Sequence, residues 1–253
     1  MLWQQTLEKM RAMKLRGMVK GVEDQQNSKG HHDMSFEERL GCLVDYEHLD
    51  RENRKLDTRL RMAKFRQQAC MEDVDFKHKR NLNRAQFLEF AKCRWAKEHK
   101  NILLTGPTGV GKSYLACALG NKACLEGFKV QYIRVPRFLT ELTIGKGDGS
   151  YLKTMRALSK VDVLLLDDWG IAKLTDDQRK EFLEVMEDRY ELKSTIITSQ
   201  IPVKNWHDII GDSTIADAIL DRIVHNSYRV ELDGPSLREK DAKAMEEKDR
   251  VKK

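Results

Sequence analysis

The chain has 253 residues, enough for one large domain or for a medium domain with a smaller appendage. Charged residues make up 34% of it and the formal net charge is +6, which permits attraction to a polyanion such as nucleic acid. No apolar run approaches the roughly 18 residues of a membrane span, and the start, MLWQQ, lacks the layout of a signal peptide, so we expect no membrane contact and a cytoplasmic location. The five cysteines contain no C-x-x-C pair, so neither a disulfide framework nor a zinc site is predicted.

The first part of the chain is dense in charge and contains no strand-like run. Apolar residues from Leu2 to Gln26 recur mostly every three or four positions, which predicts a helix. The polar stretch 25–33 contains a glycine and is predicted to be a linker. Ser35 and Glu38 have the S-x-x-E spacing of a capping box, at the start of a long charged helix expected over about residues 36–70.

From Asn101 onward, short apolar runs alternate with helical patterns, which predicts a parallel sheet with helices on both faces. Strands are expected at residues 102–105, 130–134, 161–166, 195–199 and 228–232. Helices fit between them at residues 112–126, 137–144, 175–191 and 215–225, and residues 145–149, GKGDG, are predicted to form a mobile loop. The sequence therefore predicts an α/β domain with a central parallel five-stranded sheet at residues 73–253, preceded by a helical, charged amino-terminal region at residues 1–72.

The sequence GPTGVGKS follows the first strand and opens a helix, and it matches the P-loop pattern G-x-x-x-x-G-K-[ST]. Its glycines permit a turn in which successive N–H groups point at phosphate oxygens, and the helix start adds the positive end of its dipole. Lys112 is expected on the β- and γ-phosphates and Ser113 on Mg²⁺. ATP and Mg²⁺ are the expected cofactors. The predicted nucleotide-binding residues are Gly106, Pro107, Thr108, Gly109, Val110, Gly111, Lys112, Ser113 and Tyr114.

Asp167 and Asp168 follow the apolar run VLLL, so a buried strand is expected to deliver them to the phosphate edge of the sheet. There Asp167 can hold the metal together with Ser113, and Asp168 can orient or deprotonate the attacking water. An ordinary strand end is the plainer interpretation of such a run, but the P-loop earlier in the chain favours the functional one.

Three polar side chains later in the chain have possible roles at a triphosphate. Gln200 ends the strand STIITSQ, where it can sense the γ-phosphate and position water. Arg222 lies in the helix predicted at residues 215–225 and can reach the nucleotide of a neighbouring subunit, and Arg238 follows GPSL and can touch the γ-phosphate. A turn residue, a paired surface arginine and a helix-start cation are the simpler alternatives.

The order of these features resembles that of the AAA+ ATPases. The strings GPTGVGKSYLACALG, LLLDDWG, STIITSQIPV, WHDIIGD, ADAILDRIVHNSYRVEL and SLR, with LRGM, SFEERLGCLVD and DVDF before them, resemble the IstB family over nearly the whole chain. These are ATPase helpers of bacterial insertion sequences, related to replicative helicase loaders. The resemblance implies a protein that hydrolyses ATP, assembles as a homo-oligomer on duplex DNA and helps a partner transposase insert its element. By motif match it implies ATPase roles for Lys112, Ser113, Asp167, Asp168, Gln200, Arg222 and Arg238.

Asp168 stands where AAA+ proteins usually carry glutamate. Because aspartate is one methylene shorter, we expect slow hydrolysis and a long-lived ATP-bound assembly. A single-turnover rate near the typical enzyme value of about 10 per second would contradict this expectation.

Four cations around the glycine-rich stretch, Arg134, Arg137, Lys146 and Lys153, predict contact with duplex DNA, together with the basic amino-terminal helices. Aromatic residues are sparse there, which favours backbone contact over stacking on single strands, and no base-reading motif is evident. Solvated surface charge is the plainer interpretation.

Three other functions share parts of this pattern. A replicative helicase loader would have the same ATPase core and differ in what its amino-terminal region grips. A small-molecule kinase would need an acceptor pocket and a lid, which nothing in the sequence suggests. A non-hydrolysing nucleotide-binding scaffold would be expected to lack Lys112 or Asp167, and both are present.

Overall fold

The computed structural model describes residues 2–27, 30 and 33–237. The chain divides between Thr58 and Arg59 into two compact units, which are treated separately below. This division of contacts comes earlier in the chain than residue 72, where the sequence analysis ended the amino-terminal region; that functional boundary stays a prediction. Arg238 lies outside the described residues.

Three helices begin in the first unit: α1 (Leu2–Ala12), α2 (Arg16–Asn27) and α3 (Phe36–Ala63), of which the last residues of α3 belong to the second unit. The single helix predicted over residues 2–26 is thus two helices, because Lys14 adopts the left-handed conformation with φ of 61°. The turn lets Leu7 of α1 pack against Val19 and Val22 of α2, which form a small apolar cluster. The capping box at Ser35 and Glu38 is confirmed by reciprocal hydrogen bonds.

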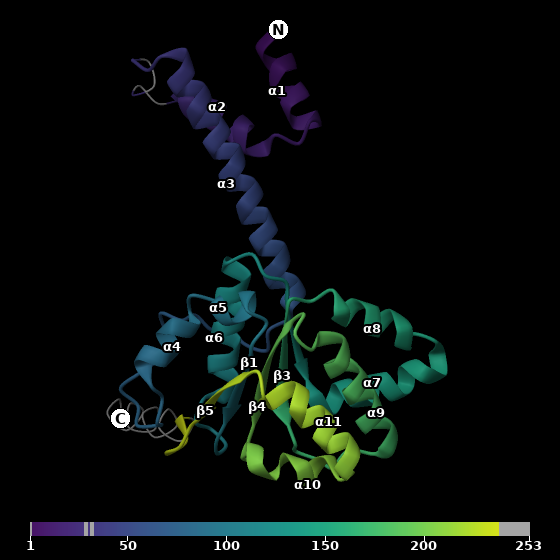
Figure 1. Cartoon of the computed structure of the whole chain (residues 1–253). Helices are drawn as coiled ribbons and strands as arrows, with labels where there is room; N and C mark the ends of the chain where they lie inside the picture. The colour runs from purple at the N-terminus through teal and green to yellow at the C-terminus, as the bar shows by residue number, and fades with distance from the viewer. Residues whose placement is uncertain (1, 28–29, 31–32, 238–253) are drawn as a thin grey trace, which may run out of the picture. The chain divides into compact units, whose positions relative to one another are not determined.

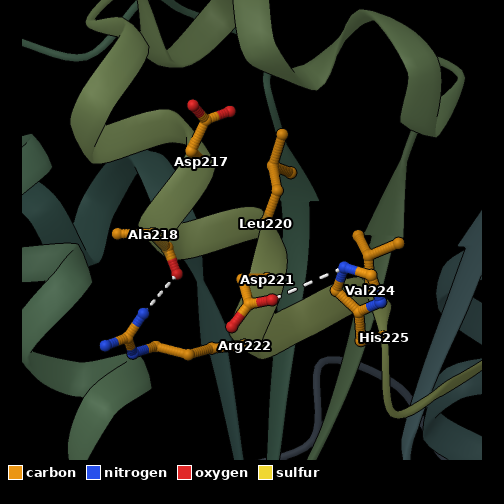
Figure 2. Close-up of a pocket in the computed structure, with 7 residues that line it drawn as sticks. All are labelled: Asp217, Ala218, Leu220, Asp221, Arg222, Val224 and His225. Atoms are coloured by element: carbon orange, nitrogen blue, oxygen red, sulfur yellow. Dashed lines mark hydrogen bonds and ion pairs between the residues drawn. The ribbon is translucent and has the colours of Figure 1, made fainter.

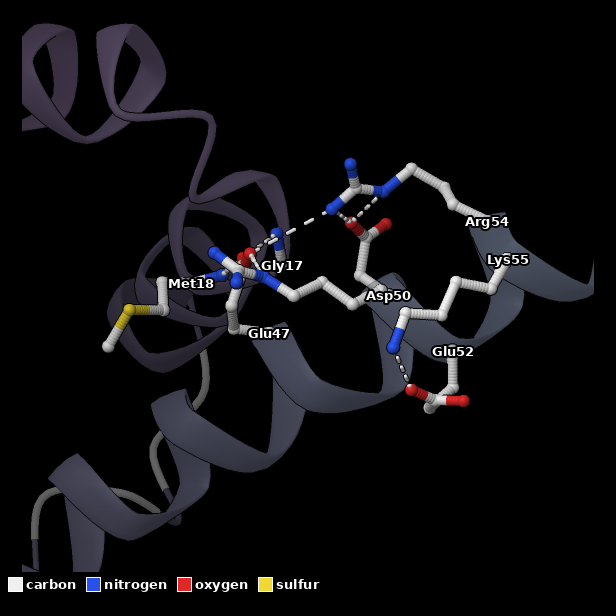
Figure 3. A network of polar contacts seen from close by, with 8 residues as sticks. Gly17, Met18, Glu47, Asp50, Glu52, Arg54 and Lys55 are labelled. Atoms are coloured by element: carbon white, nitrogen blue, oxygen red, sulfur yellow. Dashed lines mark hydrogen bonds and ion pairs between the residues drawn. The ribbon is translucent and has the colours of Figure 1, made fainter. Parts of the chain in front are cut away.

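A carboxylate of α3 holds the start of α2 (Figure 3). Glu47 Oε2 accepts hydrogen bonds from the N–H groups of Gly17 at 2.8 Å and Met18 at 3.2 Å, and Arg51 donates to Oε1 at 2.7 Å. An anion at a helix start satisfies free N–H groups and complements the helix dipole. Gly17 permits this close approach, since a Cβ there would lie 2.3 Å from the carbonyl oxygen of Tyr46.

The second unit contains the predicted parallel sheet (Figure 1). Its strands are β1 (Asn101–Thr105), β2 (Val130–Arg134), β3 (Val163–Trp169), β4 (Ser194–Ser199) and β5 (Ser227–Glu231). All pair in parallel in the order β2-β3-β4-β1-β5. The fold class and all five strands are therefore confirmed, with small differences at their ends.

Helices cover the sheet on both faces, because alternate strand residues point to opposite sides. Leu103, Leu164, Leu166 and Ile197 belong to one large core cluster with the apolar side chains of later helices. Those helices are α7 (Val135–Asp148), α8 (Tyr151–Ser159), α9 (Asp176–Arg189), α10 (Trp206–Ile210) and α11 (Ser213–Val224). The intervening strand residues lie outside this cluster and are buried on the face of α6 (Lys112–Leu125). The remaining short helices are α4 (Arg84–Phe90), α5 (Arg94–Lys97) and the 3₁₀ turn η2 (Val203–Asn205).

Two further expectations about local structure were wrong. The long helix predicted to residue 70 ends at Ala63, because Lys64 takes a left-handed conformation with φ of 53°. Residues 145–148 are not a loop but the last turn of α7, which ends at Gly149 with φ of 79°. The helical run continues there because Gly145 is buried, where a Cβ would lie 3.1 Å from Ser150 Oγ.

Candidate nucleotide site

The strand order brings the predicted site residues together at the carboxyl edge of the sheet. The P-loop follows β1, and Asp167 lies near the end of β3. These two strands are separated by β4, so the end of β4 lies between them. Polar side chains at the end of β4 are therefore placed to contact both neighbours.

Glycines shape the P-loop in the way that its sequence predicts. Gly106, Gly109 and Gly111 have φ values of 145°, 86° and 96°, which disfavour other residues. A Cβ at Gly106 would also lie 2.3 Å from the carbonyl oxygen of Leu232, which follows β5. Within this turn, Lys112 Nζ donates to the carbonyl oxygens of Gly106 at 2.7 Å and Pro107 at 2.8 Å. The ammonium group of Lys112 thus lies over the turn of the P-loop and is bound by its carbonyl oxygens.

A buried arginine that the sequence analysis missed supports the P-loop from behind. Arg80 is 2% exposed and donates to the carbonyl oxygens of Val110 and Asp75, each at 3.0 Å. A Cβ at Gly111 would lie 2.5 Å from Arg80 Nη1, so the glycine is needed for this contact. Burial lowers the pKa of Arg80 from its ordinary value. No motif marks this residue, because the contact spans thirty positions.

Asp167 is fully buried, and hydroxyl groups from three elements surround it. Its Oδ1 accepts from Ser113 Oγ at 2.7 Å and from Thr198 Oγ1, and its Oδ2 accepts from Tyr132 at 2.6 Å. Burial raises the pKa of Tyr132, and the hydrogen bond to Asp167 raises it further, so this hydroxyl keeps its proton and donates. Arg66 also lies in this group, with Nη1 3.8 Å from Oδ2.

Asp168 points away from Asp167 because β3 is irregular at this point. The pairing of β3 with β4 shifts between Leu166 and Trp169, and Asp168 has a left-handed φ of 66°. A bulge of this kind redirects side chains and is common near active sites. Arg134, at the end of β2, donates to Asp168 Oδ2 at 2.6 Å, and the Asp168 N–H lies 3.2 Å from Thr198 Oγ1.

Arg66, Arg134 and Asp168 line a cavity of about 400 Å³ together with the P-loop. This volume lies in the range of small-molecule sites, roughly 300–1,000 Å³. Gln200 is at its wall and accepts a hydrogen bond from Thr108 Oγ1 at 2.7 Å, so the residue after β4 reaches the P-loop. Other lining residues include Gly109, Gly111, Lys112, Ser113, Tyr114 and Asp168.

The oxygen atoms at Ser113 and Asp167 fit a magnesium ion bound jointly with phosphates. Mg²⁺ prefers oxygen ligands and usually takes one or two from the protein, the rest coming from water and substrate phosphates. Among residues 2–27, 30 and 33–237 no group of three or more metal-binding acids, histidines or cysteines was found. A transition-metal cage is thus not offered by these residues, whereas the hydroxyl and carboxylate pair matches shared magnesium coordination.

Arg222 is not part of this cavity. It lies on α11, where it donates to the carbonyl oxygen of Ala218 at 2.8 Å (Figure 2). It also donates to Glu187 Oε1 of α9 at 2.8 Å. Its partner is therefore Glu187, and neighbouring Asp221 pairs with His225 instead. Arg222 lines a separate hollow of about 490 Å³ on the surface of α11.

The segment before Arg238 lies against the P-loop. The Leu237 N–H donates to the carbonyl oxygen of Gly109 at 3.0 Å, and a Cβ at Gly109 would lie 2.1 Å from Ser236 Oγ. Leu237 also lines the cavity. The chain thus passes the nucleotide site just before its described part ends, although the role of Arg238 itself stays a prediction.

The four predicted DNA-contacting cations have different surroundings. Arg134 lines the nucleotide cavity, whereas Arg137 is 82% exposed and pairs with Glu141. Lys146 pairs at 2.7 Å with Glu181, which is only 2% exposed, and Lys153 is exposed on α8. The contact of these four residues with DNA stays a prediction.

Fold and site together define a P-loop AAA+ protein that binds ATP. The model of the IstB-like ATP binding proteins matches residues 8–245, and the chain belongs to this family. It is 48% identical to y4pL of Sinorhizobium fredii over 94% of this chain and 97% of that protein, and 44% identical to a protein of insertion sequence IS1162 of Pseudomonas fluorescens over 80% and 88%. Both carry the name of insertion sequence ATP-binding proteins.

Solved structures agree with the fold. DnaI is 26% identical and superposes with a TM-score of 0.58 over 65% of this chain and 91% of its own. The replication initiator DnaA, bound to AMPPCP and single-stranded DNA, is 20% identical with a TM-score of 0.54 over 68% and 52%, a likeness of fold alone. None of the helices in the described part of the chain is long and apolar enough to cross a membrane.

Proposed function

We propose that this protein is the ATP-hydrolysing helper of an insertion sequence, which assembles on duplex target DNA and stimulates its partner transposase. The observation that carries the ATPase part is that Lys112, Ser113 and Gln200 line one cavity, while Asp167 accepts a hydrogen bond from Ser113 Oγ at 2.7 Å. Membership of the IstB-like family and the names of its relatives support the link to transposition. Cytoplasmic location is part of the same proposal.

Each side chain has a distinct task in the proposed hydrolysis. The P-loop N–H groups and Lys112 bind the phosphates, and Ser113 and Asp167 would hold Mg²⁺, which supplies charge neutralisation at the phosphoryl oxygens. Asp168 accepts a proton from the attacking water or orients it. Gln200, just after β4, senses the γ-phosphate and positions the same water. Arg222 and Arg238 are proposed to add positive charge at the γ-phosphate, Arg222 in a neighbouring subunit.

DNA-stimulated hydrolysis is supported by the position of Arg134. This arginine pairs with Asp168 and is also one of the cations proposed to contact DNA. If a DNA phosphate takes Arg134, Asp168 is released to act on water. The same residue then links DNA binding to hydrolysis.

The proposal is tested with Lys112→Ala in the full chain. We expect ATP binding to weaken by about ten- to a hundredfold, because a hydrogen bond to a charged group is worth about 1.5–3 kcal/mol. DNA-stimulated hydrolysis and transposase-dependent insertion should fall with it. Unchanged ATP binding in this variant would refute the site.

A replicative helicase loader is the second candidate, favoured by the likeness to DnaI. The full chain, incubated with ATP and DNA, should co-purify with the transposase of its own insertion sequence. Capture of a replicative helicase in preference to the transposase would decide for the loader. Sedimentation in the same mixture tests assembly, since a monomer would exclude the proposed role of Arg222 in trans.

A further inference from the structure

A cation from outside the recognised motifs reaches the centre of the site. Arg66 lies between α3 and α4, and its Nη1 is 3.8 Å from Asp167 Oδ2. Its side chain is 46% exposed and lines the cavity, whereas Asp167 is completely buried. Among the cations of the described ranges, Arg66 is the one within ion-pair distance of Asp167.

The segment that carries Arg66 is fixed to α6, the helix that begins in the P-loop. Arg59 donates to the carbonyl oxygen of Cys124 at 2.9 Å, and Phe65 packs so closely on Gly120 that a Cβ there would lie 2.7 Å from its ring. Burial and the nearby Asp167 charge raise the pKa of the Cys117 thiol to about 11, and the backbone of Gln67 and Arg66 beside the thiol acts to lower it. These three α6 positions lie on one face of the helix. Arg66 is thereby held in register with the phosphate cradle.

A divalent ion and the Arg66 guanidinium group repel each other if both lie next to Asp167. The Asp167 carboxylate accepts hydrogen bonds from three hydroxyl groups and has the Arg66 guanidinium 3.8 Å away. A divalent ion bound there would be repelled by a guanidinium group at this distance. The phosphates of a nucleotide relieve the conflict, because their negative charge attracts both the ion and the guanidinium.

We propose that Arg66 is the counter-ion of Asp167 in the nucleotide-free protein and moves to the nucleotide's phosphates when the magnesium nucleotide binds. This inference rests on the proposed function of the site. Arg66 is a positioning residue in this role: it keeps a divalent ion from Asp167 until phosphates arrive. Arg66 lies three residues after the end of α3 in the sequence. The exchange of partners therefore occurs close along the chain to this helix.

The test is a titration with Mn²⁺ as a paramagnetic probe, followed by electron paramagnetic resonance. The full-length parent, Arg66→Ala, Arg66→Lys and Arg61→Ala are compared, first without nucleotide and then saturated with a nonhydrolysable ATP analogue. Arg61 is a matched control, because it is an exposed arginine at the end of α3 that does not line the cavity.

Without nucleotide, Arg66→Ala should bind Mn²⁺ about tenfold more tightly than the parent, because a neighbouring positive charge is removed. Arg66→Lys and Arg61→Ala should stay near the parent. With the analogue bound, the difference between Arg66→Ala and the parent should shrink to less than about threefold, since Arg66 has already left Asp167.

Two outcomes overturn the inference. Equal Mn²⁺ affinity of the parent and Arg66→Ala without nucleotide, including no measurable binding to either, shows that Arg66 does not guard Asp167. An equal effect with and without the analogue shows that Arg66 does not exchange partners. Failure of the proposed function appears differently: the parent would not bind the analogue, or, with the analogue bound, Asp167→Asn would bind Mn²⁺ as tightly as the parent does.

Discussion

Two buried charges lie at opposite ends of the same strands and are stabilised in different ways. Asp167, at the carboxyl end of β3, is fully buried, and its polar partners in the described part of the chain are side chains, namely those of Ser113, Thr198, Tyr132 and Arg66. Arg189, the last residue of α9, is 2% exposed and lies at the amino ends of β3 and β4. It donates to the backbone carbonyls of Leu158, Val161, Asp162 and Ser194 and to Thr195 Oγ1.

This difference distinguishes a functional site, at Asp167, from a purely structural contact, at Arg189. Hydroxyl and guanidinium partners can rotate away, so the surroundings of Asp167 can be exchanged for a metal ion and phosphates. Carbonyl oxygens of the main chain cannot move without deforming the sheet, so the partners of Arg189 are permanent. Substitutions at the first position should change binding and hydrolysis, and substitutions at the second should change stability.

The largest expected effect comes from Asp167→Asn. The amide keeps the size of the side chain and an oxygen for the hydroxyl donors but loses the charge that attracts Mg²⁺. We expect ATP hydrolysis to fall by about 10²- to 10³-fold, the usual loss when one electrostatic stabiliser of a transition state is removed. Steady-state hydrolysis measures this loss, and thermal unfolding should change by less than about 1 kcal/mol. A large loss of stability would mean that Asp167 has a structural role, as Arg189 does.

The sequence predicted the sheet well because its central strands contain short apolar runs, such as VLLL before Asp167, which are typical of strands covered on both faces. It predicted the P-loop because one local stretch of chain contains all of its residues. It could not predict the partners of Asp167, because Tyr132, Thr198 and Arg66 come from three separate segments that only the folded chain brings together.

The missed helix has a local cause. Tyr151–Ser159 forms α8, which the sequence analysis left unassigned because the preceding glycines were interpreted as a loop. Gly145 is instead a contact position inside α7, and Lys146 is held by buried Glu181 and the ring of Tyr151. Packing therefore overrides the flexibility that glycine composition suggests.

The next largest effect is expected for Arg189→Met, which keeps the length of the side chain and removes the donors. Several buried carbonyls would lose their partners, at about 1–3 kcal/mol each when no water replaces the donor. We expect a loss of about 4 kcal/mol in the free energy of unfolding, measured by denaturant titration. Arg156→Met on the exposed surface of α8 is the control and should change little. Equal stability of the two variants would contradict the structural assignment of Arg189.

Arg134→Ala should have a smaller effect, and on rate rather than stability. The pair with Asp168 involves an arginine that is 53% exposed, so its removal is worth at most about 1 kcal/mol, or about fivefold in rate. We expect basal hydrolysis to rise within this limit and stimulation by DNA to disappear, because Asp168 is already free. Arg229→Ala, an exposed arginine on the opposite edge strand β5, is the control. A fall in basal hydrolysis would show that Arg134 assists catalysis instead.

The smallest expected effect concerns Asp162, beside Arg189 at the amino edge of the sheet. Burial acts to raise the pKa of this carboxyl group, but the ion pair with Lys193 at 2.6 Å and the hydrogen bond from the Lys129 N–H at 2.9 Å outweigh it, so the pKa is lowered. A lowered pKa means that the folded protein prefers the ionised form. The resulting stability is present above the ordinary value of about 4 and is lost as the pH falls through the lower value of the folded state.

Thermal unfolding of the parent and of Asp162→Asn between about pH 2.5 and 7 measures this contribution. We expect the variant to melt about 2 °C lower at neutral pH, the scale of a weak ion pair in a domain of this size, and the two curves to converge in acid. The amide can still accept the Lys129 hydrogen bond, so the charge alone is removed. A difference that grows as the pH falls would mean that the folded protein favours the protonated form of Asp162. The ion pair of Asp162 would then not stabilise this edge of the sheet, and the backbone contacts of Arg189 would stabilise it without Asp162.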